Sequence, residues 1–298
     1  MNKWLLPIMV GFLLLSGPVF AAEATYVGSE PCRGCHEEIS KSHGDSIHAQ
    51  AWASLAGKYS NSGCESCHGP GSVHIDTNAK ADIISFGKDS AQDAETQSAQ
   101  CLKCHITSTE LAFWDVSQHN GEISCTDCHN IHASAVPKVA QPDTCFECHK
   151  DVRRDASKRS HHPIIEGKVT CSDCHNPHGS MEHSMLRADS RNQLCYKCHA
   201  EKRGPFIWEH PPVEENCGIC HEPHGSLHAK LLTERVPNLC QDCHDWSYHP
   251  GTPYDNNNGF DTAGTPPTFD DKFVGRSCLN CHNNVHGSNS PDSKMFVR

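Results

Sequence analysis

Ten copies of Cys-x-x-Cys-His run through this chain and use up every one of its 20 cysteines. In such a motif the two thiols can add to the vinyl groups of a haem, and the adjacent imidazole can reach its iron. Zinc sites also use Cys-x-x-Cys pairs, but zinc requires no histidine directly after the second thiol. A disulfide framework leaves the histidines unexplained as well. The pattern therefore predicts ten covalently attached c-type haems.

Each motif supplies two thioether positions and one axial histidine. The predicted thioether cysteines are Cys32, Cys35, Cys64, Cys67, Cys101, Cys104, Cys125, Cys128, Cys145, Cys148, Cys171, Cys174, Cys195, Cys198, Cys217, Cys220, Cys240, Cys243, Cys278 and Cys281. The predicted proximal ligands of the haem irons are His36, His68, His105, His129, His149, His175, His199, His221, His244 and His282.

Fourteen further histidines could supply the second axial ligand of each iron. They recur in register, with one histidine shortly after alternate motifs and another before the same motifs, often as His-Pro. This register selects as distal ligands His48, His74, His119, His132, His162, His178, His210, His224, His249 and His286. The surplus histidines are His43, His161, His183 and His228. The choice between His48 and His43 stays open, as does the choice between His162 and His161.

Methionine offers little competition for these positions, because only Met181, Met185 and Met295 lie outside the N-terminal leader. Iron with two histidine ligands is therefore expected throughout. Methionine–histidine ligation raises the potential of a haem, so the haems of this chain should have low potentials. Each ligating ring should donate its other N–H to a carbonyl, a propionate or a water, which fixes the ring orientation.

The aliphatic content is too low for a conventional interior. Leu, Ile, Val and Phe together make up about 17% of the residues, below the level at which a chain usually buries enough apolar surface to fold. We therefore predict a multihaem cytochrome c fold, mostly coil with short α-helices around the haems, elongated as a haem wire, with little or no β-structure. Helices are expected over Cys195 to Lys202, His36 to Ala56 and Asp93 to His105. The haem-free chain is expected to stay unfolded.

A repeat and a basic segment suggest how the chain is organised. CTDCHNIHAS at Cys125, CSDCHNPHGS at Cys171 and CGICHEPHGS at Cys217 follow one another at 46-residue intervals, as in arrays whose units contact their neighbours. The basic segment Lys150 to Arg159 divides the motifs five and five. We expect two pentahaem modules, 25–150 and 151–298, and a long loop over Pro250 to Lys272.

Residues 1–22 are expected to be a cleaved signal peptide, with Lys3 before an apolar stretch and small residues at its end. The predicted address is therefore the periplasm, where cytochrome c maturation attaches haem. The formal net charge of −11 makes nucleic acid an improbable partner.

Catalysis at a haem needs an open or exchangeable iron site. Multihaem nitrite and tetrathionate reductases typically carry one Cys-x-x-Cys-Lys motif, and this chain has none. Saturated irons favour an electron-transfer protein over an enzyme, and a terminal reductase is the weaker alternative. High-spin ferric signals would favour that alternative.

Several stretches of the chain resemble the DmsE/MtrA family of periplasmic decahaem cytochromes, whose relatives include PioA and MtoA. They are SHGDSIHAQAW at Ser42–Trp52, CESCHGPGSVH at Cys64–His74, CYKCHAEKRGPFIWEHPPV at Cys195–Val213, CHEPHGS at Cys220–Ser226 and FVGRSCLNCHNNVHGSN at Phe273–Asn289. The resemblance covers nearly the whole chain after the leader.

This resemblance implies a haem wire inserted in an outer-membrane β-barrel porin, which relays electrons between periplasm and cell exterior. The implied partners are that porin, an extracellular multihaem cytochrome, and periplasmic or inner-membrane quinol-linked cytochromes. The flow would serve respiration of metals or dimethyl sulfoxide, or Fe(II) oxidation in the reverse direction. The competing hypothesis is a soluble periplasmic electron shuttle or store.

Overall fold

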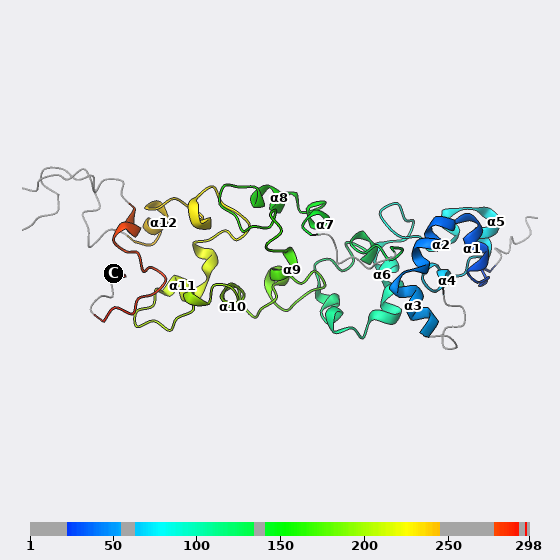
Figure 1. Cartoon of the computed structure of the whole chain (residues 1–298), viewed down its shortest axis with the longest axis horizontal. Helices are drawn as coiled ribbons and strands as arrows, with labels where there is room; N and C mark the ends of the chain where they lie inside the picture. Colours follow the sequence, from blue (N-terminus) through cyan, green and yellow to red (C-terminus); the bar gives the residue numbers. More distant parts are fainter. Residues whose placement is uncertain (1–22, 55–62, 134–140, 245–276, 292–295, 297–298) are drawn as a thin grey trace, which may run out of the picture. The chain divides into compact units, whose positions relative to one another are not determined.

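The computed structural model describes residues 23–54, 63–133, 141–244, 277–291 and 296. Helices in this part of the chain are short, and its only extended pairings are four isolated antiparallel bridges. The expected class, coil with short helices and no sheet, is thus confirmed (Figure 1). The described residues form two compact units, the first within residues 1–100 and 131–136 and the second within residues 101–130 and 137–298.

The first unit carries the first two motifs on short helices. Its elements are α1 (Glu30–Cys35), α2 (Glu37–Gly44), α3 (Ile47–Ser54), α4 (Cys64–His68), α5 (Ser72–Thr77) and a 3-10 turn at Lys80–Asp82. Helix α6 (Ala94–His105) contains the point at which the two units divide.

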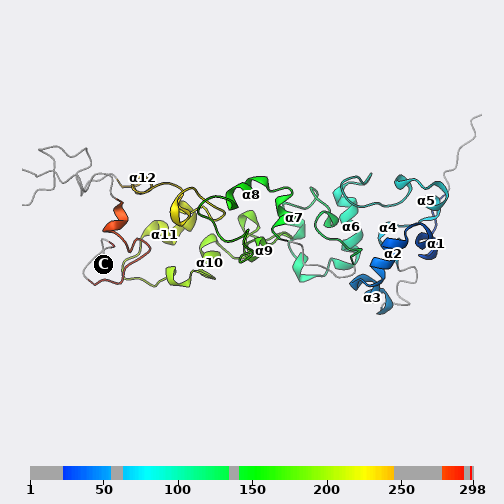
Figure 2. The same cartoon turned by 45° about the horizontal axis from the view of Figure 1, so that its top comes forward.

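The second unit carries the other eight motifs. Its α-helices are α7 (Asp143–Phe146), α8 (Lys150–Ala156), α9 (Cys171–Cys174), α10 (Arg191–Tyr196), α11 (Pro211–Glu215) and α12 (Asn238–Gln241). Its 3-10 turns are Thr109–Leu111, Trp114–Val116, Cys125–Asp127, His183–Met185, Ala200–Lys202, Cys217–Ile219, Ala229–Leu231 and Cys278–Asn280. Within this unit the helices from α7 to α12 follow one another broadly in chain order, as both views show (Figures 1 and 2).

A motif of this kind forms a single helical turn, and the helical period explains why. In eight motifs the amide of the histidine donates to the carbonyl of the first cysteine, at 2.9–3.0 Å, and in the other two the histidine is the last residue of α4 or α6. Residues three apart on a helix share one face, so the turn presents both sulfurs to the same side. The following histidine lies one turn from the first cysteine, on that same side. The local backbone therefore gathers all three haem-binding atoms without help from distant residues.

Several of these turns begin at a polar residue placed directly before the first cysteine. Ser124 and Thr170 form capping boxes with the acidic residue inside their motif, and Asn216 accepts from the amide of Gly218 at 2.8 Å. Ser277 accepts from the amide of Leu279 at 3.3 Å. Capping satisfies backbone donors that a one-turn helix cannot pair internally. The first three caps recur at the 46-residue interval of the motifs.

The apolar interior is very small. Among the described residues only four hydrophobic side chains are buried, namely Trp114, Phe146, Ala156 and Ile164. The last three form one cluster with Val152 and Val169. Such a cluster cannot offset the conformational entropy of ordering a chain of this length. The haems are therefore the expected interior of the folded protein.

The basic segment at the expected module boundary is a packed helix. It forms α8, whose Ala156 is fully buried against Phe146 and Ile164. Asp155 pairs with Arg154 at 2.9 Å and with Lys158 at 3.0 Å, so part of the positive charge is compensated locally. The two compact units do not divide at residue 150, and the two pentahaem modules stay a prediction.

The three helices expected from the sequence agree to different degrees with the helices of the structure. The helix expected over Asp93 to His105 is α6, and the stretch His36 to Ala56 is two helices, α2 and α3. The helix expected from Cys195 instead begins at Arg191, capped by Ser190, and its α-helical part ends at Tyr196. The predicted leader and the loop at Pro250 to Lys272 lie outside the described residues. In the part that is described, no helix has the length and apolar character needed to cross a membrane.

Candidate haem-binding array

The motifs of the second unit contact one another in the order of the sequence. The thiol of Cys145 hydrogen-bonds to that of Cys171, and the thiols of Cys195 and Cys217 are joined in the same way, as are those of Cys240 and Cys278. Between these pairs, Cys174 lies within electrostatic range of Cys195 and Cys198, and Cys220 within range of Cys243. Cys128 interacts likewise with Cys148 of the next motif, and His129 with His105 of the preceding one. Haems attached to consecutive motifs of this unit would therefore be neighbours in space.

Eight motif histidines face a second histidine ring. The ring centroids lie 6.0–6.4 Å apart in the pairs His36–His74, His68–His132, His129–His178, His119–His149, His162–His199, His175–His224, His210–His244 and His221–His286. In each of these pairs one ring belongs to a motif and the other is a residue that the sequence selected as a distal ligand.

This separation is the one that two axial ligands of a single iron require. A metal–imidazole bond is about 2.0 Å long and the ring centroid lies about 1.1 Å behind the bound nitrogen, so two imidazoles on opposite sides of one iron have centroids about 6.2 Å apart. In the described part of the chain, no cluster of three or more His, Cys, Asp or Glu side chains is placed to hold a bare metal ion. A structural zinc site needs four ligands, whereas these rings face each other in twos.

The pairs follow a register that skips along the chain. The histidine after a motif faces the motif two places earlier, as His178 faces His129 and His224 faces His175. The histidine that precedes one motif faces the histidine of the next motif along the chain. His162, for example, precedes the motif at Cys171 and faces His199 of the motif at Cys195. At the N-terminal end, His74 faces the motif histidine immediately upstream, His36.

Two positions were open from the sequence. His162 and not His161 faces a motif histidine, because the ring of His161 contacts the Lys158 carbonyl and Glu166 instead. The surplus His43 lies edge-on to His132, with centroids 6.3 Å apart. The remaining members of the selected set are His48 and His249. Both stay predictions as distal ligands, and His249 lies outside the described residues.

The second ring nitrogen of many of these histidines is held by a backbone carbonyl. Before the motifs, His119 Nδ1 donates to the Pro177 carbonyl at 3.0 Å and His162 Nδ1 to the Pro223 carbonyl at 2.6 Å. Each acceptor directly precedes the histidine of a Pro-His-Gly-Ser segment. A proton held on Nδ1 leaves Nε2 as the free acceptor, which is the nitrogen a metal would bind.

The Nδ1 atoms of two motif histidines donate to backbone carbonyls of another kind of segment. His175 Nδ1 donates to the Ser184 carbonyl at 2.7 Å, and His221 Nδ1 to the Lys230 carbonyl at 2.9 Å. Ser184 and Lys230 have φ of +59° and +60°, in the left-handed region that residues with a side chain rarely occupy. This backbone strain recurs 46 residues apart, and in both places it aims a carbonyl at a predicted ligand.

Further carbonyls hold the rings of the first unit. His68 Nδ1 donates to the Ile84 carbonyl at 2.7 Å, and His74 Nδ1 donates to the Ala79 carbonyl at 2.9 Å. The segment that supplies both acceptors is the insert after the second motif, in which the sequence shows no haem motif. Its residues therefore orient one ligand of the preceding motif, His68, and one ligand within the insert itself, His74.

Burial keeps many of these rings in the neutral form. Burial lowers the pKa of seven predicted ligands, His68, His129, His132, His178, His210, His224 and His286. Neighbouring histidine rings also lower the pKa of these residues, since two imidazolium charges repel each other. Neutral imidazole is the form that binds a metal, so the environment favours metal binding at neutral pH.

The glycine of the His-Gly-Ser segments permits a close backbone approach. A Cβ at Gly179 would lie well under 3.0 Å from the carbonyl oxygen of Phe113, and one at Gly225 equally close to that of Asp155. Gly287 approaches the ring of Phe206 in the same way. Each of these glycines directly follows a predicted distal ligand. This close contact holds the neighbouring ligand against a segment from another part of the unit.

One buried indole supports the fit of a haem. The Nε1–H of Trp114 is buried without a hydrogen-bond partner, and its side chain is only 6% exposed. Its ring lies edge-on to His178, at a centroid distance of 6.4 Å. A buried donor of this kind costs free energy unless an acceptor reaches it, and a haem carries two propionates that can accept. The paired rings, the paired thiols and this donor together fit a covalently bound haem.

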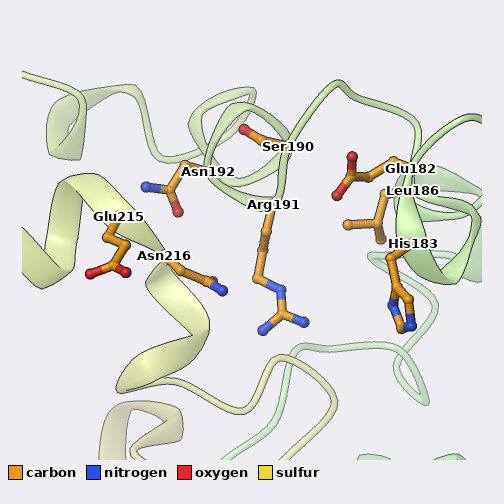
Figure 3. A pocket seen from close by; sticks show the side chains of 8 residues that line it. All are labelled: Glu182, His183, Leu186, Ser190, Arg191, Asn192, Glu215 and Asn216. Atoms are coloured by element: carbon orange, nitrogen blue, oxygen red, sulfur yellow. The ribbon is translucent and has the colours of Figure 1, made fainter.

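The surplus histidine His183 lies at the rim of a polar hollow. The hollow has a volume of about 360 Å³. Figure 3 shows its lining, with the side chain of Arg191 extended among the other residues. Glu182, Leu186, Ser190, Asn192, Glu215 and Asn216 complete the lining. Arg191 also passes close over Gly218 of the neighbouring motif, where a side chain would collide with it. His183 Nδ1 bonds to the Ser184 hydroxyl at 2.8 Å.

Comparison with known proteins agrees with this geometry. Residues 161–204 and 210–248 match the doubled CXXCH motif family, and residues 64–140 match the NrfB-like cytochrome c-type protein family. The chain is similar to a multihaem cytochrome MtrA of Shewanella baltica (strain OS185), with 41% identity over 286 residues that cover 93% of this chain and 84% of that protein. At this identity over nearly its whole length, the chain belongs to the MtrA family of multihaem c-type cytochromes.

Proposed function

We propose that this electron-transfer cytochrome holds ten bis-histidine haems and relays electrons along them in the order of its motifs. When bound, each haem iron would accept and donate one electron. The observation that carries the proposal is the set of eight histidine pairs at 6.0–6.4 Å, each with the spacing of two ligands on one iron. Ligation from both sides leaves no iron position for a substrate, so the proposed role is transfer and not catalysis.

The protein's own residues would bind, orient and shield the haems. The cysteines of each helical turn would form the thioethers. Carbonyls such as those of Pro177 and Pro223 hold the imidazole rings in one orientation. Fixed ligands limit the reorganisation that accompanies a change of iron charge, which is the structural demand of fast electron transfer.

We also propose an exported protein that works inside an outer-membrane β-barrel porin, with an extracellular cytochrome at one end and quinol-linked cytochromes at the other. Support comes from the family resemblance and from the consecutive contacts of the motifs in the second unit. The interior of a large barrel is polar and can enclose a cytochrome without a membrane-spanning helix.

Purification from the native membrane in mild detergent tests the location. We expect a β-barrel protein to co-purify in a fixed ratio, identified by mass spectrometry. If the cytochrome instead leaves the cell with the periplasmic fraction and carries no barrel, the conduit is wrong and a soluble shuttle or store is right.

Reconstitution of the purified complex in liposomes tests the relay itself. An external reductant should reduce an acceptor trapped inside, and His178→Ala should slow this transfer because one haem would lose an axial ligand. The matched control is His183→Ala, which removes a histidine five residues away whose Nδ1 bonds to the Ser184 hydroxyl. Equal rates for the two variants would contradict a relay through these sites.

A further inference from the structure

A buried carboxylate lies inside the second haem-binding motif. Glu65 occupies the first variable position of Cys64-Glu-Ser-Cys-His68, on helix α4, and only 2% of it is exposed. Acidic residues are almost never this deeply buried unless their charge is paired or hydrogen-bonded. Haem attachment by the motif requires only the two cysteines and the histidine, so this glutamate needs another explanation.

Backbone amides surround the carboxylate. The amide of Val27 donates to both carboxylate oxygens at 3.0 and 3.1 Å, and the amide of Gly28 donates to Oε2 at 2.7 Å. The amide of Gly71 donates to Oε1 at 2.8 Å. Packing here is tight, because a Cβ at Gly71 would lie 3.3 Å from Oε1. Hydrogen bonds to an ionised acceptor are about twice as strong as those between neutral groups.

The residues that donate these hydrogen bonds lie directly before the two helices that position the predicted ligands of the first haem. Gly28 lies two residues before α1, which holds the first motif and ends at the C-cap His36. Gly71 is the N-cap of α5, which holds His74. The rings of His36 and His74 face each other with centroids 6.4 Å apart and an interplanar angle of 17°. The Glu65 side chain of the second motif therefore binds the backbone directly before α1 and directly before α5.

Neighbouring bonds run between the same two segments. The Ser29 hydroxyl accepts from the amide of Cys64 at 3.2 Å. The amide of Thr25 donates to the Ser72 hydroxyl at 2.8 Å, and the amide of Ser72 donates to the Thr25 carbonyl at 3.2 Å. The bond from Thr25 to the Ser72 hydroxyl is exposed, whereas the bonds to Glu65 are buried or partly buried. The carboxylate also lies within electrostatic range of Cys32, the first thioether cysteine of the first motif.

We propose that Glu65 is a positioning residue that aligns both axial histidines of the first haem with the second motif and keeps a negative charge beside that haem. This inference rests on the proposed bis-histidine ligation. A fixed negative charge stabilises the ferric form over the ferrous form, so the carboxylate would lower the potential of the first haem.

The test compares Glu65→Gln with Glu38→Gln in the holoprotein. Both variants remove one acidic group near the first motif, but Glu38 is exposed on α2. In a spectroelectrochemical titration, Glu65→Gln should raise the potential of one haem by at least 59 mV, a tenfold change for one electron, because the charge is lost and the amide nitrogen faces backbone donors. Glu38→Gln should titrate like the parent. If Glu65→Gln also superimposes on the parent, the inference is wrong.

Hydrogen exchange of the unmodified holoprotein gives a second test that does not depend on the variant folding. Peptides that cover residues 25–29 and 70–73 should retain deuterium-resistant amides at Val27, Gly28 and Gly71. Exchange there as fast as in exposed turns would overturn the inference. Failure of the bis-histidine proposal would be recognised separately, because high-spin ferric iron would then appear in the parent protein itself.

Discussion

The close approach at Gly179 allows a quantitative prediction for Gly179→Ala. This glycine has φ of +105°, and its Cα faces the carbonyl of Phe113. A methyl group there could be accommodated only if the turn that carries His178 moved away from the Phe113 segment. The same turn supplies the Pro177 carbonyl to His119, so the movement would disturb two predicted haem sites.

Two costs add up at this position. A positive φ outside the favoured left-handed region costs a residue with a side chain about 1–3 kcal/mol. Forcing a methyl group into a tight contact costs about 1–3 kcal/mol more. Gly179→Ala should therefore lower the free energy of unfolding by about 2–6 kcal/mol. The matched control is Gly167→Ala, where φ is +69° and no atom lies within 4 Å of the added Cβ. That variant should lose about 1–2 kcal/mol.

Denaturant titration of the holoproteins, followed by circular dichroism and by the Soret band, measures both losses. The low-spin ferric signal should also fall in Gly179→Ala and stay intact in Gly167→Ala. Equal unfolding free energies for the two variants would refute the argument, since they would show that the contact with Phe113 contributes nothing.

Three further predictions concern single sites and the cofactor. Asp173→Ala should lower the free energy of unfolding by about 0.5–2 kcal/mol, because it removes a capping box. Hydrogen bonds from Thr170 lower the pKa of Asp173 below its ordinary value of 3.8. The difference in stability from the parent should therefore be full above about pH 4 and vanish as the pH falls through that lowered pKa. His162→Ala should convert one haem to a high-spin form that added imidazole restores, whereas His161→Ala should leave the ferric spectrum unchanged; the opposite result would reverse the assignment made from His199. Haem-free protein, made with every motif cysteine replaced by serine, should show no cooperative melt by circular dichroism, and a cooperative transition would contradict the view that haems form the interior.

Much of the candidate site was predictable because its chemistry is local. A Cys-x-x-Cys-His segment closes one helical turn by itself, so the haem-binding atoms could be identified from spacing alone. The histidine set was readable for a similar reason, since the 46-residue repeat places equivalent histidines at equivalent positions. All eight pairs join a motif histidine to a member of the set selected from the sequence.

The pairing of these histidines could not be predicted. A post-motif histidine such as His178 lies three residues from His175 but faces His129, 49 positions away in the sequence. That choice depends on how successive turns stack, which spacing does not encode. Glu65 was missed for another reason: one carboxylate in a motif is usually solvated, and its backbone donors come from residues 27, 28 and 71.

The left-handed residues were likewise invisible. Ser184 and Lys230 share neither residue type nor a turn signature, although each aims a carbonyl at a motif histidine. Strain of this kind is stabilised by its surroundings and leaves no mark in local propensity. The helix expected over Cys195 to Lys202 is also interrupted, since the backbone of His199 leaves the helical region with φ of −104° and ψ of 48°.

The central claim is that pairs of imidazoles enclose every iron of this chain. Electron paramagnetic resonance of the fully oxidised holoprotein, with spins counted against a whole-protein mass, tests it most directly. The account predicts a mass increment of ten haems and ferric iron that is low-spin throughout. A smaller increment, or a high-spin signal equal to one haem or more, would contradict it.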